Sequence, residues 1–186
     1  MEALFTSTLT VALAEIGDKT QLLSLLLAAR FSNKRAIIAG ILLATIINHG
    51  LSAWLGQYSI QWLSSDWVQY ILSGSFIAIG LWILIPDKMD EETNLMANLG
   101  PFFATLILFF LAEIGDKTQV ATVVLGAQYQ NLLWVTLGTT IGMLLANIPV
   151  IYFGEALMKR LPLNATRILA ASLFIIMGII TGFWPS

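Results

Sequence analysis

The chain has 186 residues, of which 58% are hydrophobic and 11% are charged, and its formal net charge is −2. Soluble domains usually contain about 25% charged residues, so this composition excludes an ordinary soluble domain and indicates an integral protein of the lipid bilayer. The sequence contains no cysteine, which excludes disulfide bonds and thiolate metal sites.

Six apolar runs are each long enough to cross about 30 Å of hydrocarbon as a helix that rises about 1.5 Å per residue. The N-terminus lacks the basic segment of a secretory signal peptide, so we expect the first run to be retained as a helix. The short connections are typical of a compact multi-pass protein of the bacterial inner (cytoplasmic) membrane. The runs predict an all-α membrane protein with six transmembrane helices, near residues 4–29, 36–57, 67–86, 101–127, 132–154 and 166–184.

Basic residues are distributed unevenly between the connections. Apart from Lys19 and Lys117, the seven lysines and arginines all lie in or beside the first, third and fifth connections. The positive-inside rule places those connections in the cytoplasm and both chain termini on the extracytoplasmic side. The third connection, 87–99, is acidic, and we expect it to be a solvated cytoplasmic linker.

A stretch of nine residues, Leu-Ala-Glu-Ile-Gly-Asp-Lys-Thr-Gln, occurs twice, at 13–21 and at 111–119. Each copy lies near the middle of a predicted transmembrane run, where an unpaired charged side chain costs about 2.5 to 3.5 kcal/mol. Charged residues at such positions in both copies indicate a functional site rather than a packing role.

The spacing inside each copy predicts where its carboxylates point. On a continuous helix, residues three apart share one face, so Glu15 lies beside Asp18 and Glu113 beside Asp116. The glycine between each pair permits a kink or a close helix crossing. The lysine after each aspartate is about 100° further around the helix, so we expect it to point elsewhere.

The duplication extends beyond the motif at the same offset of 98 residues, at which Phe5 matches Phe103. Each half crosses the membrane three times, an odd number, so the second half must enter from the opposite side. The predicted fold is therefore two inverted three-helix repeats (3+3). We expect a single transmembrane transport domain, 1–186, made of a first repeat at 1–86, the linker at 87–99 and a second repeat at 100–186.

Inversion would bring the two motifs face to face near the bilayer midplane. Four carboxylates, those of Glu15, Asp18, Glu113 and Asp116, would then line one cation site. Hard oxygen ligands of this kind suit Mg²⁺, Ca²⁺ or Mn²⁺, whereas Zn²⁺ and Cu²⁺ prefer imidazole or sulfur. Further candidate ligands are nearby polar residues, namely Thr20, Gln21, Asn48, Thr118, Gln119 and Asn147.

These polar residues also allow other interpretations. The carboxylates of one copy can form salt bridges with the lysine of the other copy, Lys19 or Lys117, and so join the two halves. Asn48 and Asn147, at comparable depth in the second and fifth runs, can bind the ion or hydrogen-bond between helices. His49 is the single histidine, and we expect it to have a structural role rather than to bind metal.

The repeated Glu-x-Gly-Asp-Lys-Thr signature, with one copy in the first helix of each half, resembles that of a small cation/proton exchanger family. This family includes bacterial manganese exporters of the MneA type and the Golgi transmembrane protein 165. The resemblance covers the whole chain and implies that Glu15, Asp18, Glu113 and Asp116 are the acidic positions of the family motif. It also implies export of Mn²⁺ in exchange for protons, with Ca²⁺ transported by some eukaryotic relatives.

We therefore expect a secondary transporter that exports Mn²⁺ from the cytoplasm, with protons as the counter-ion. A calcium/proton antiporter and a passive cation channel are the alternatives. We expect no enzyme activity, because no nucleophile with a base and no phosphate-cradling loop is evident in the sequence. The expected partners are the divalent ion and the lipid bilayer; we expect no cofactor and no nucleic acid, and the patterns indicate no oligomeric state.

Overall fold

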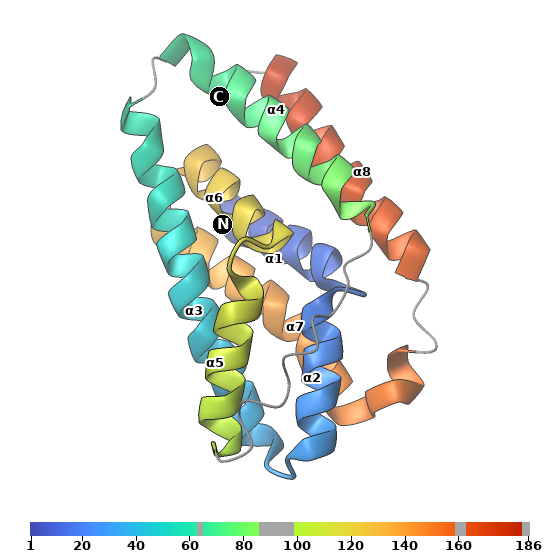
Figure 1. Ribbon diagram of the computed structural model, residues 1–186. Helices are drawn as coiled ribbons and strands as arrows, with labels where there is room; N and C mark the ends of the chain where they lie inside the picture. The colour runs from blue at the N-terminus through green and yellow to red at the C-terminus, as the bar shows by residue number, and fades with distance from the viewer. Residues whose placement is uncertain (63–64, 86–98, 159–162, 184–186) are drawn as a thin grey trace.

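The all-α prediction is confirmed by a computed structural model, which describes residues 1–62, 65–85, 99–158 and 163–183 and has only helices in those ranges (Figure 1). The acidic residues of the predicted linker lie outside the described ranges. The elements are, in chain order, α1 (Glu2–Glu15), α2 (Lys19–Arg30), α3 (Lys34–Ser59), the 3-10 turn η1 (Ile60–Trp62), α4 (Ser65–Ile83), α5 (Pro101–Glu113), α6 (Lys117–Tyr129), α7 (Leu132–Met158) and α8 (Leu163–Phe183).

Three of the described helices are long and apolar enough to cross a membrane: Lys34–Trp62, Leu132–Gly154 and Leu163–Phe183. They correspond to the second, fifth and sixth predicted runs. Two shorter apolar helices, Trp67–Ile83 and Pro101–Glu113, fall in the third and fourth runs. The complete arrangement of six spans, and the side on which each terminus lies, stay predictions.

The first and fourth runs are not continuous helices, so that expectation was wrong. In each copy of the motif one helix ends at the glutamate and the next helix begins at the lysine, four residues later. A short non-helical segment lies between them. The cause is the glycine, which has φ of +84° at Gly17 and +74° at Gly115, in the left-handed region that interrupts a helix. The two carboxylates of a copy therefore lie on opposite sides of a helix break instead of on one helix face.

Each break leaves backbone groups without helical partners, and a glutamine of the same motif satisfies one of them. The side-chain oxygen of Gln21 accepts a hydrogen bond from the Gly17 N–H at 2.8 Å, and Gln119 accepts one from the Gly115 N–H at 2.6 Å. Irregular backbone at membrane depth is tolerated where it is buried in protein or lines a cavity. The identical sequences thus build the same break twice.

The broken helices of each half pack mainly on the other half. Helix α1 packs along α7 and α5 along α3, while α2 contacts α7 and α6 contacts α3. Helices α4 and α8 form an antiparallel pair along one edge of the molecule (Figure 1), where α4 also contacts α6 and α8 also contacts α1. This exchange of contacts brings the two helix breaks toward each other in the interior.

Glycines allow the long helices to approach the broken ones closely. A Cβ atom at Gly56 of α3 would lie 1.9 Å from the Val123 carbonyl oxygen of α6, and one at Gly126 of α6 would lie 2.4 Å from the Ala53 oxygen. The contact of α7 with α1 is similar, since a Cβ at Gly142 would lie 2.6 Å from the Thr8 oxygen. Small residues that let helix backbones touch are typical of helix packing in membranes.

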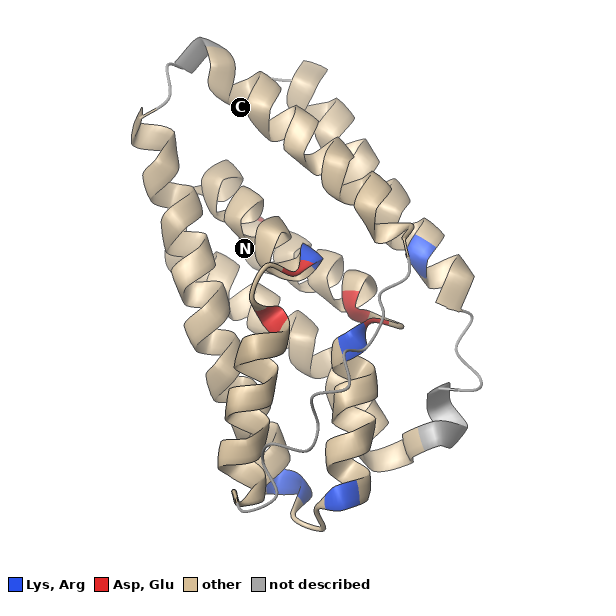
Figure 2. Cartoon of the chain, viewed as in Figure 1, with Lys and Arg blue, Asp and Glu red and all other residues tan. Residues whose placement is uncertain are grey.

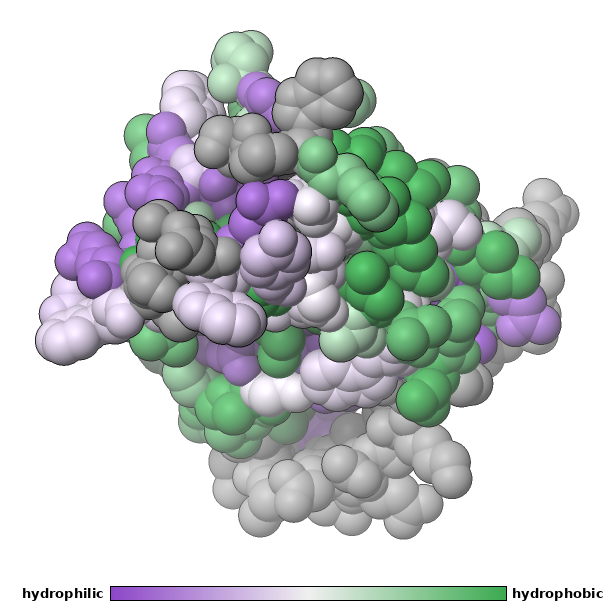
Figure 3. All heavy atoms as spheres, turned by 90° about the horizontal axis from the view of Figure 1, so that it is seen from above, coloured by the Kyte–Doolittle hydropathy of each residue, from purple (hydrophilic) through white to green (hydrophobic). Residues whose placement is uncertain are grey.

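The distribution of side chains is that of a lipid-embedded protein. Large apolar residues are exposed on the helices, for example Leu51, Trp54 and Leu133, and hydrophobic residues cover much of the face drawn in Figure 3. Polar and acidic side chains are instead buried, and Figure 2 shows acidic residues at both helix breaks. The buried interior therefore holds the acidic residues of both motifs, together with polar residues outside them such as Thr45, Asn48 and Asn147.

We expect Gly56→Ala to destabilise the protein, because the new methyl group forces α3 and α6 apart. Overpacking of this kind typically costs about 1–3 kcal/mol. The measurement is the temperature at which detergent-solubilised protein loses its monodisperse peak in size-exclusion chromatography. Gly74→Ala is the matched control, because nothing lies within 4 Å of a Cβ at Gly74; equal thermal stability of the two variants would contradict the packing account.

Candidate metal centre

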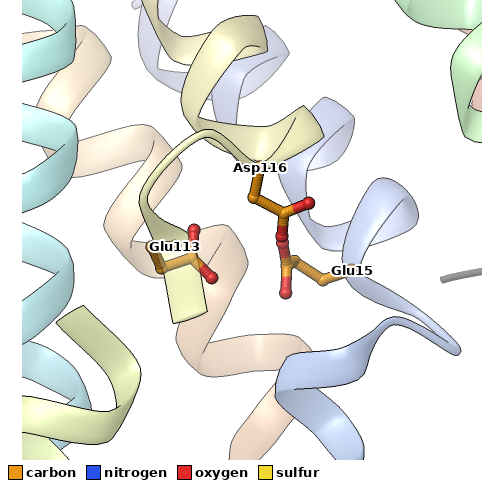
Figure 4. A group of neighbouring side chains, drawn as sticks. All are labelled: Glu15, Glu113 and Asp116. Carbon is orange, nitrogen blue, oxygen red and sulfur yellow. The ribbon is translucent and has the colours of Figure 1, made fainter. Parts of the chain in front are cut away.

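Three carboxylates meet at the point where the two helix breaks face each other. Glu15 is the last residue of α1, Glu113 is the last residue of α5, and Asp116 is the N-cap of α6. One ligand oxygen from each lies within 4.8 Å of the others, and all three side chains are buried (Figure 4). Both copies of the motif contribute to this cluster.

The fourth predicted carboxylate is not part of this cluster. Among the described residues, the group with mutually close ligand atoms contains Glu15, Glu113 and Asp116 and does not contain Asp18. Asp18 occupies the N-cap of α2, the position that Asp116 occupies in α6, and it is also buried. The two copies, although identical in sequence, are therefore arranged differently around the centre.

Glu15 is held by two threonines, one from each copy of the motif. The hydroxyl groups of Thr20 and Thr118 donate hydrogen bonds to its two carboxylate oxygens. All three side chains are fully or almost fully buried. Thr20 and Thr118, which the sequence offered as further ligands, thus orient a carboxylate in this structure, and the bond from Thr118 joins the two halves.

Glu113 has no such support. Both of its carboxylate oxygens are buried and have no hydrogen-bond partner, and the same is true of Oδ2 of Asp116. Oδ1 of Asp116 accepts a bond from the backbone N–H of Lys117 at 2.7 Å. Burying a carboxylate without a hydrogen bond or a counter-charge is very costly, so these oxygens present an environment suited to a cation.

Lys19 reaches the centre, contrary to the expectation that it would point elsewhere. Its Nζ lies 3.6 Å from Oδ2 of Asp116, and its side chain is 26% exposed. This is one of the salt bridges between copies that the alternative interpretation described, and the helix break makes it possible by redirecting the start of α2. Lys117 differs, because its Nζ donates to the Ile85 carbonyl at 2.6 Å.

The remaining candidate ligands connect helices of opposite halves. Asn48 donates to the Phe110 carbonyl at 3.1 Å, and Asn147 accepts from the Ser24 hydroxyl at 2.7 Å. Gln21, besides supporting its own helix break, donates to the Ala146 carbonyl of α7 at 2.8 Å. The interhelical hydrogen bonds considered for the two asparagines are thus present.

The structure adds His49 of α3, which sequence reasoning had assigned a structural role. It is completely buried, and its Nε2 lies 3.6 Å from Oε2 of Glu113. At the offset of 98 residues that relates the motifs, the counterpart of Asn147 is His49 and not Asn48. Applying that offset strictly was the signal that could have identified His49 from the sequence.

Comparison with known families identifies a family of divalent-cation transporters. The family model described as "Divalent cation/proton antiporter GDT1" matches residues 3–91 and 101–184, which together include both motifs. The chain belongs to the GDT1 family. The description of the GDT1 family is that of a transporter, a divalent cation/proton antiporter.

Individual GDT1 relatives match over almost their whole length. A Vibrio cholerae protein named "Putative manganese exporter" is 53% identical over 185 residues, which is 99% of this chain and 92% of the relative. The Arabidopsis thaliana "GDT1-like protein 5" is 29% identical over 94% of this chain and 93% of its own. No solved structure matches the chain.

We expect the two glutamines that support the helix breaks to differ in importance. Gln21→Leu removes the partner of the Gly17 N–H and that of the Ala146 carbonyl, whereas Gln119→Leu removes the partner of the more exposed Gly115 N–H. A buried group left without a partner costs about 1–3 kcal/mol. Gln21→Leu should therefore lower the unfolding temperature in detergent more than Gln119→Leu does. A larger decrease for Gln119→Leu would refute this ranking.

Proposed function

We propose that this protein exports Mn²⁺ from the bacterial cytoplasm in exchange for protons. It would do so in the inner membrane, as six transmembrane segments in two inverted repeats with both termini outside. The first and fourth segments would each consist of two half-helices joined at the motif. Discontinuous helices of this kind, meeting at mid-membrane between repeats, are typical of ion sites in secondary transporters.

The observation that carries the proposal is the buried cluster of Glu15, Glu113 and Asp116. With all three ionised, and with Lys19 as the adjacent cation, the cluster has a net charge of −2 (three negative charges and one positive). One divalent ion would neutralise that charge. The oxygens of Glu113 have no hydrogen-bond partner to give up when an ion binds.

Ligand chemistry and the relatives both favour Mn²⁺. Carboxylate oxygens suit Mg²⁺, Ca²⁺ and Mn²⁺. The Vibrio cholerae relative, whose name describes a manganese exporter, shares 53% of its aligned residues with this chain. Proton exchange follows from the same ligands, since a carboxylate must lose its proton before it binds metal, and a proton that returns displaces the ion.

The unequal arrangement of two identical motifs suggests how the site changes its access. Here the second copy supplies Glu113 and Asp116, the first supplies Glu15, and Lys19 pairs with Asp116. We propose that in the opposite state the copies exchange roles, so that Asp18 enters the centre and pairs with Lys117. Inverted repeats can exchange conformations in this way because each half has the same nine-residue motif.

We expect Glu113→Gln to abolish Mn²⁺ transport while the protein remains folded. The loss should exceed the roughly 10- to 100-fold drop in metal affinity that follows removal of an outer-shell partner. The measurement is Mn²⁺ flux into proteoliposomes with a simultaneous record of internal pH. Glu2→Gln is the matched control, because it makes the same substitution at an exposed residue at the start of α1.

The same assay separates the proposed function from its alternatives. An antiporter moves protons against the direction of Mn²⁺, and Mn²⁺ flux without proton movement would instead indicate a passive channel. Stronger competition by Ca²⁺ than by unlabelled Mn²⁺ would indicate a calcium/proton antiporter. Wild-type flux in the Glu113→Gln variant would remove the cluster from the mechanism.

We also expect Asp18→Asn to impair transport as severely as Asp116→Asn, although Asp18 lies outside the cluster in this structure. An exchange of roles requires both aspartates over a full cycle, whereas a fixed site requires only Asp116. Initial rates of Mn²⁺ flux in matched proteoliposomes test this expectation. Normal transport by Asp18→Asn, with none by Asp116→Asn, would show that the centre keeps one set of ligands.

A further inference from the structure

His49 is in an unusual environment for a structural histidine. Its side chain is completely buried in α3, and neither ring nitrogen has a hydrogen-bond partner. Its Nε2 lies 3.6 Å from Oε2 of Glu113, which is too long for a hydrogen bond. Buried polar groups in proteins are nearly always satisfied, so an open Nε2 beside an open carboxylate indicates a place for a shared partner between these two atoms.

The counterpart of His49 in the other half is satisfied by the protein itself. Asn147, 98 residues later, accepts a hydrogen bond from Ser24 and donates one to the Met143 carbonyl at 3.0 Å. Each residue lies on the long helix that packs against the motif of the opposite half. The motifs are identical, but His49 and Asn147 differ in chemistry. The amide of Asn147 is held by hydrogen bonds, whereas the imidazole of His49 has no hydrogen-bond partner.

The distance between the two open groups fits ligands of one ion. Neighbouring ligand atoms in an octahedral site with bonds of about 2.1 Å are about 3 Å apart. The separation of 3.6 Å between Nε2 of His49 and Oε2 of Glu113 is slightly wider, as expected where no ion draws the ligands together. His49 is not in the group whose ligand atoms all lie within 4.8 Å of one another, so it borders the carboxylate cluster on the side of Glu113.

We propose that His49 is a nitrogen ligand of the transported ion and makes the centre prefer Mn²⁺ over Ca²⁺ and Mg²⁺. The proposal rests on the proposed function, since it assigns the selectivity of the same site. Ca²⁺ and Mg²⁺ bind almost entirely through oxygen. Mn²⁺ also suits carboxylates, but as a first-row transition metal it accepts an imidazole nitrogen more readily than those two ions do, although less readily than Fe²⁺, Ni²⁺ or Zn²⁺. One imidazole nitrogen among carboxylates would thus favour Mn²⁺ over Ca²⁺ and Mg²⁺. The carboxylate oxygens would still bind all three ions.

The decisive experiment uses the full chain, purified without a histidine tag and loaded with Mn²⁺. Because the sequence contains one histidine, electron spin echo modulation from an imidazole nitrogen could come only from His49. We expect that nitrogen signal in the wild type and its loss in His49→Gln. Bound Mn²⁺ with no nitrogen coupling in the wild type would overturn the proposal.

Metal affinities give a second, independent test. We expect His49→Gln to lower the affinity for Mn²⁺ at least about tenfold, by analogy with the loss of an outer-shell partner, and to leave that for Ca²⁺ nearly unchanged. His49→Asn provides the same comparison if His49→Gln does not fold. Ser52→Ala, one turn along α3 at another buried position, is the matched control and should keep the wild-type ratio. Equal loss of affinity for both ions would show a structural role and overturn the proposal.

The two proposals fail in different ways. A wild-type protein that binds Mn²⁺ through nitrogen but does not move it across proteoliposome membranes would refute the export function and leave the ligand assignment intact. A wild-type protein that exports Mn²⁺ with no nitrogen coupling would refute the ligand assignment and leave the export function intact.

Discussion

The whole structure depends on one constraint: a carboxylate inside a membrane protein must be given a partner. Glu15, Glu113 and Asp116 are buried within a shell whose outer surface is apolar. Water is not available there to solvate them, so threonine hydroxyls, a backbone N–H and one lysine take its place. The oxygens that these groups leave open define where a cation can bind.

The helix breaks are the means by which the fold meets that constraint. A continuous helix would satisfy its own backbone but would hold Glu113 and Asp116 on a single rod, with Lys117 pointing away. With the helix broken at a left-handed glycine in each copy, three of the four motif carboxylates, Glu15, Glu113 and Asp116, meet at one point. The backbone groups released by the break are then satisfied in part by the glutamine that ends each motif.

The two identical motifs have different hydrogen-bond and ion-pair partners in this structure. Both threonines donate to Glu15 and neither donates to Glu113. Lys19 pairs with Asp116 of the other copy, and Lys117 donates to the Ile85 carbonyl. Two identical motifs that adopt unequal arrangements have a second arrangement of the same kind available to them. In a fully symmetric centre the carboxylates of both copies would have the same hydrogen-bond partners, and exchanging the copies would give no new arrangement.

The sequence by itself determined the all-helical membrane class and the duplication, because hydropathy and an exact nine-residue repeat are properties that need no coordinates. It also predicted one site for the four motif carboxylates, of which the structure brings Glu15, Glu113 and Asp116 together and leaves Asp18 outside. Only the tertiary structure decided that the motif breaks its helix, that Lys19 reaches Asp116 and that His49 borders Glu113. Those outcomes depend on backbone angles at two glycines and on which helices of opposite halves touch, and local sequence patterns do not fix either.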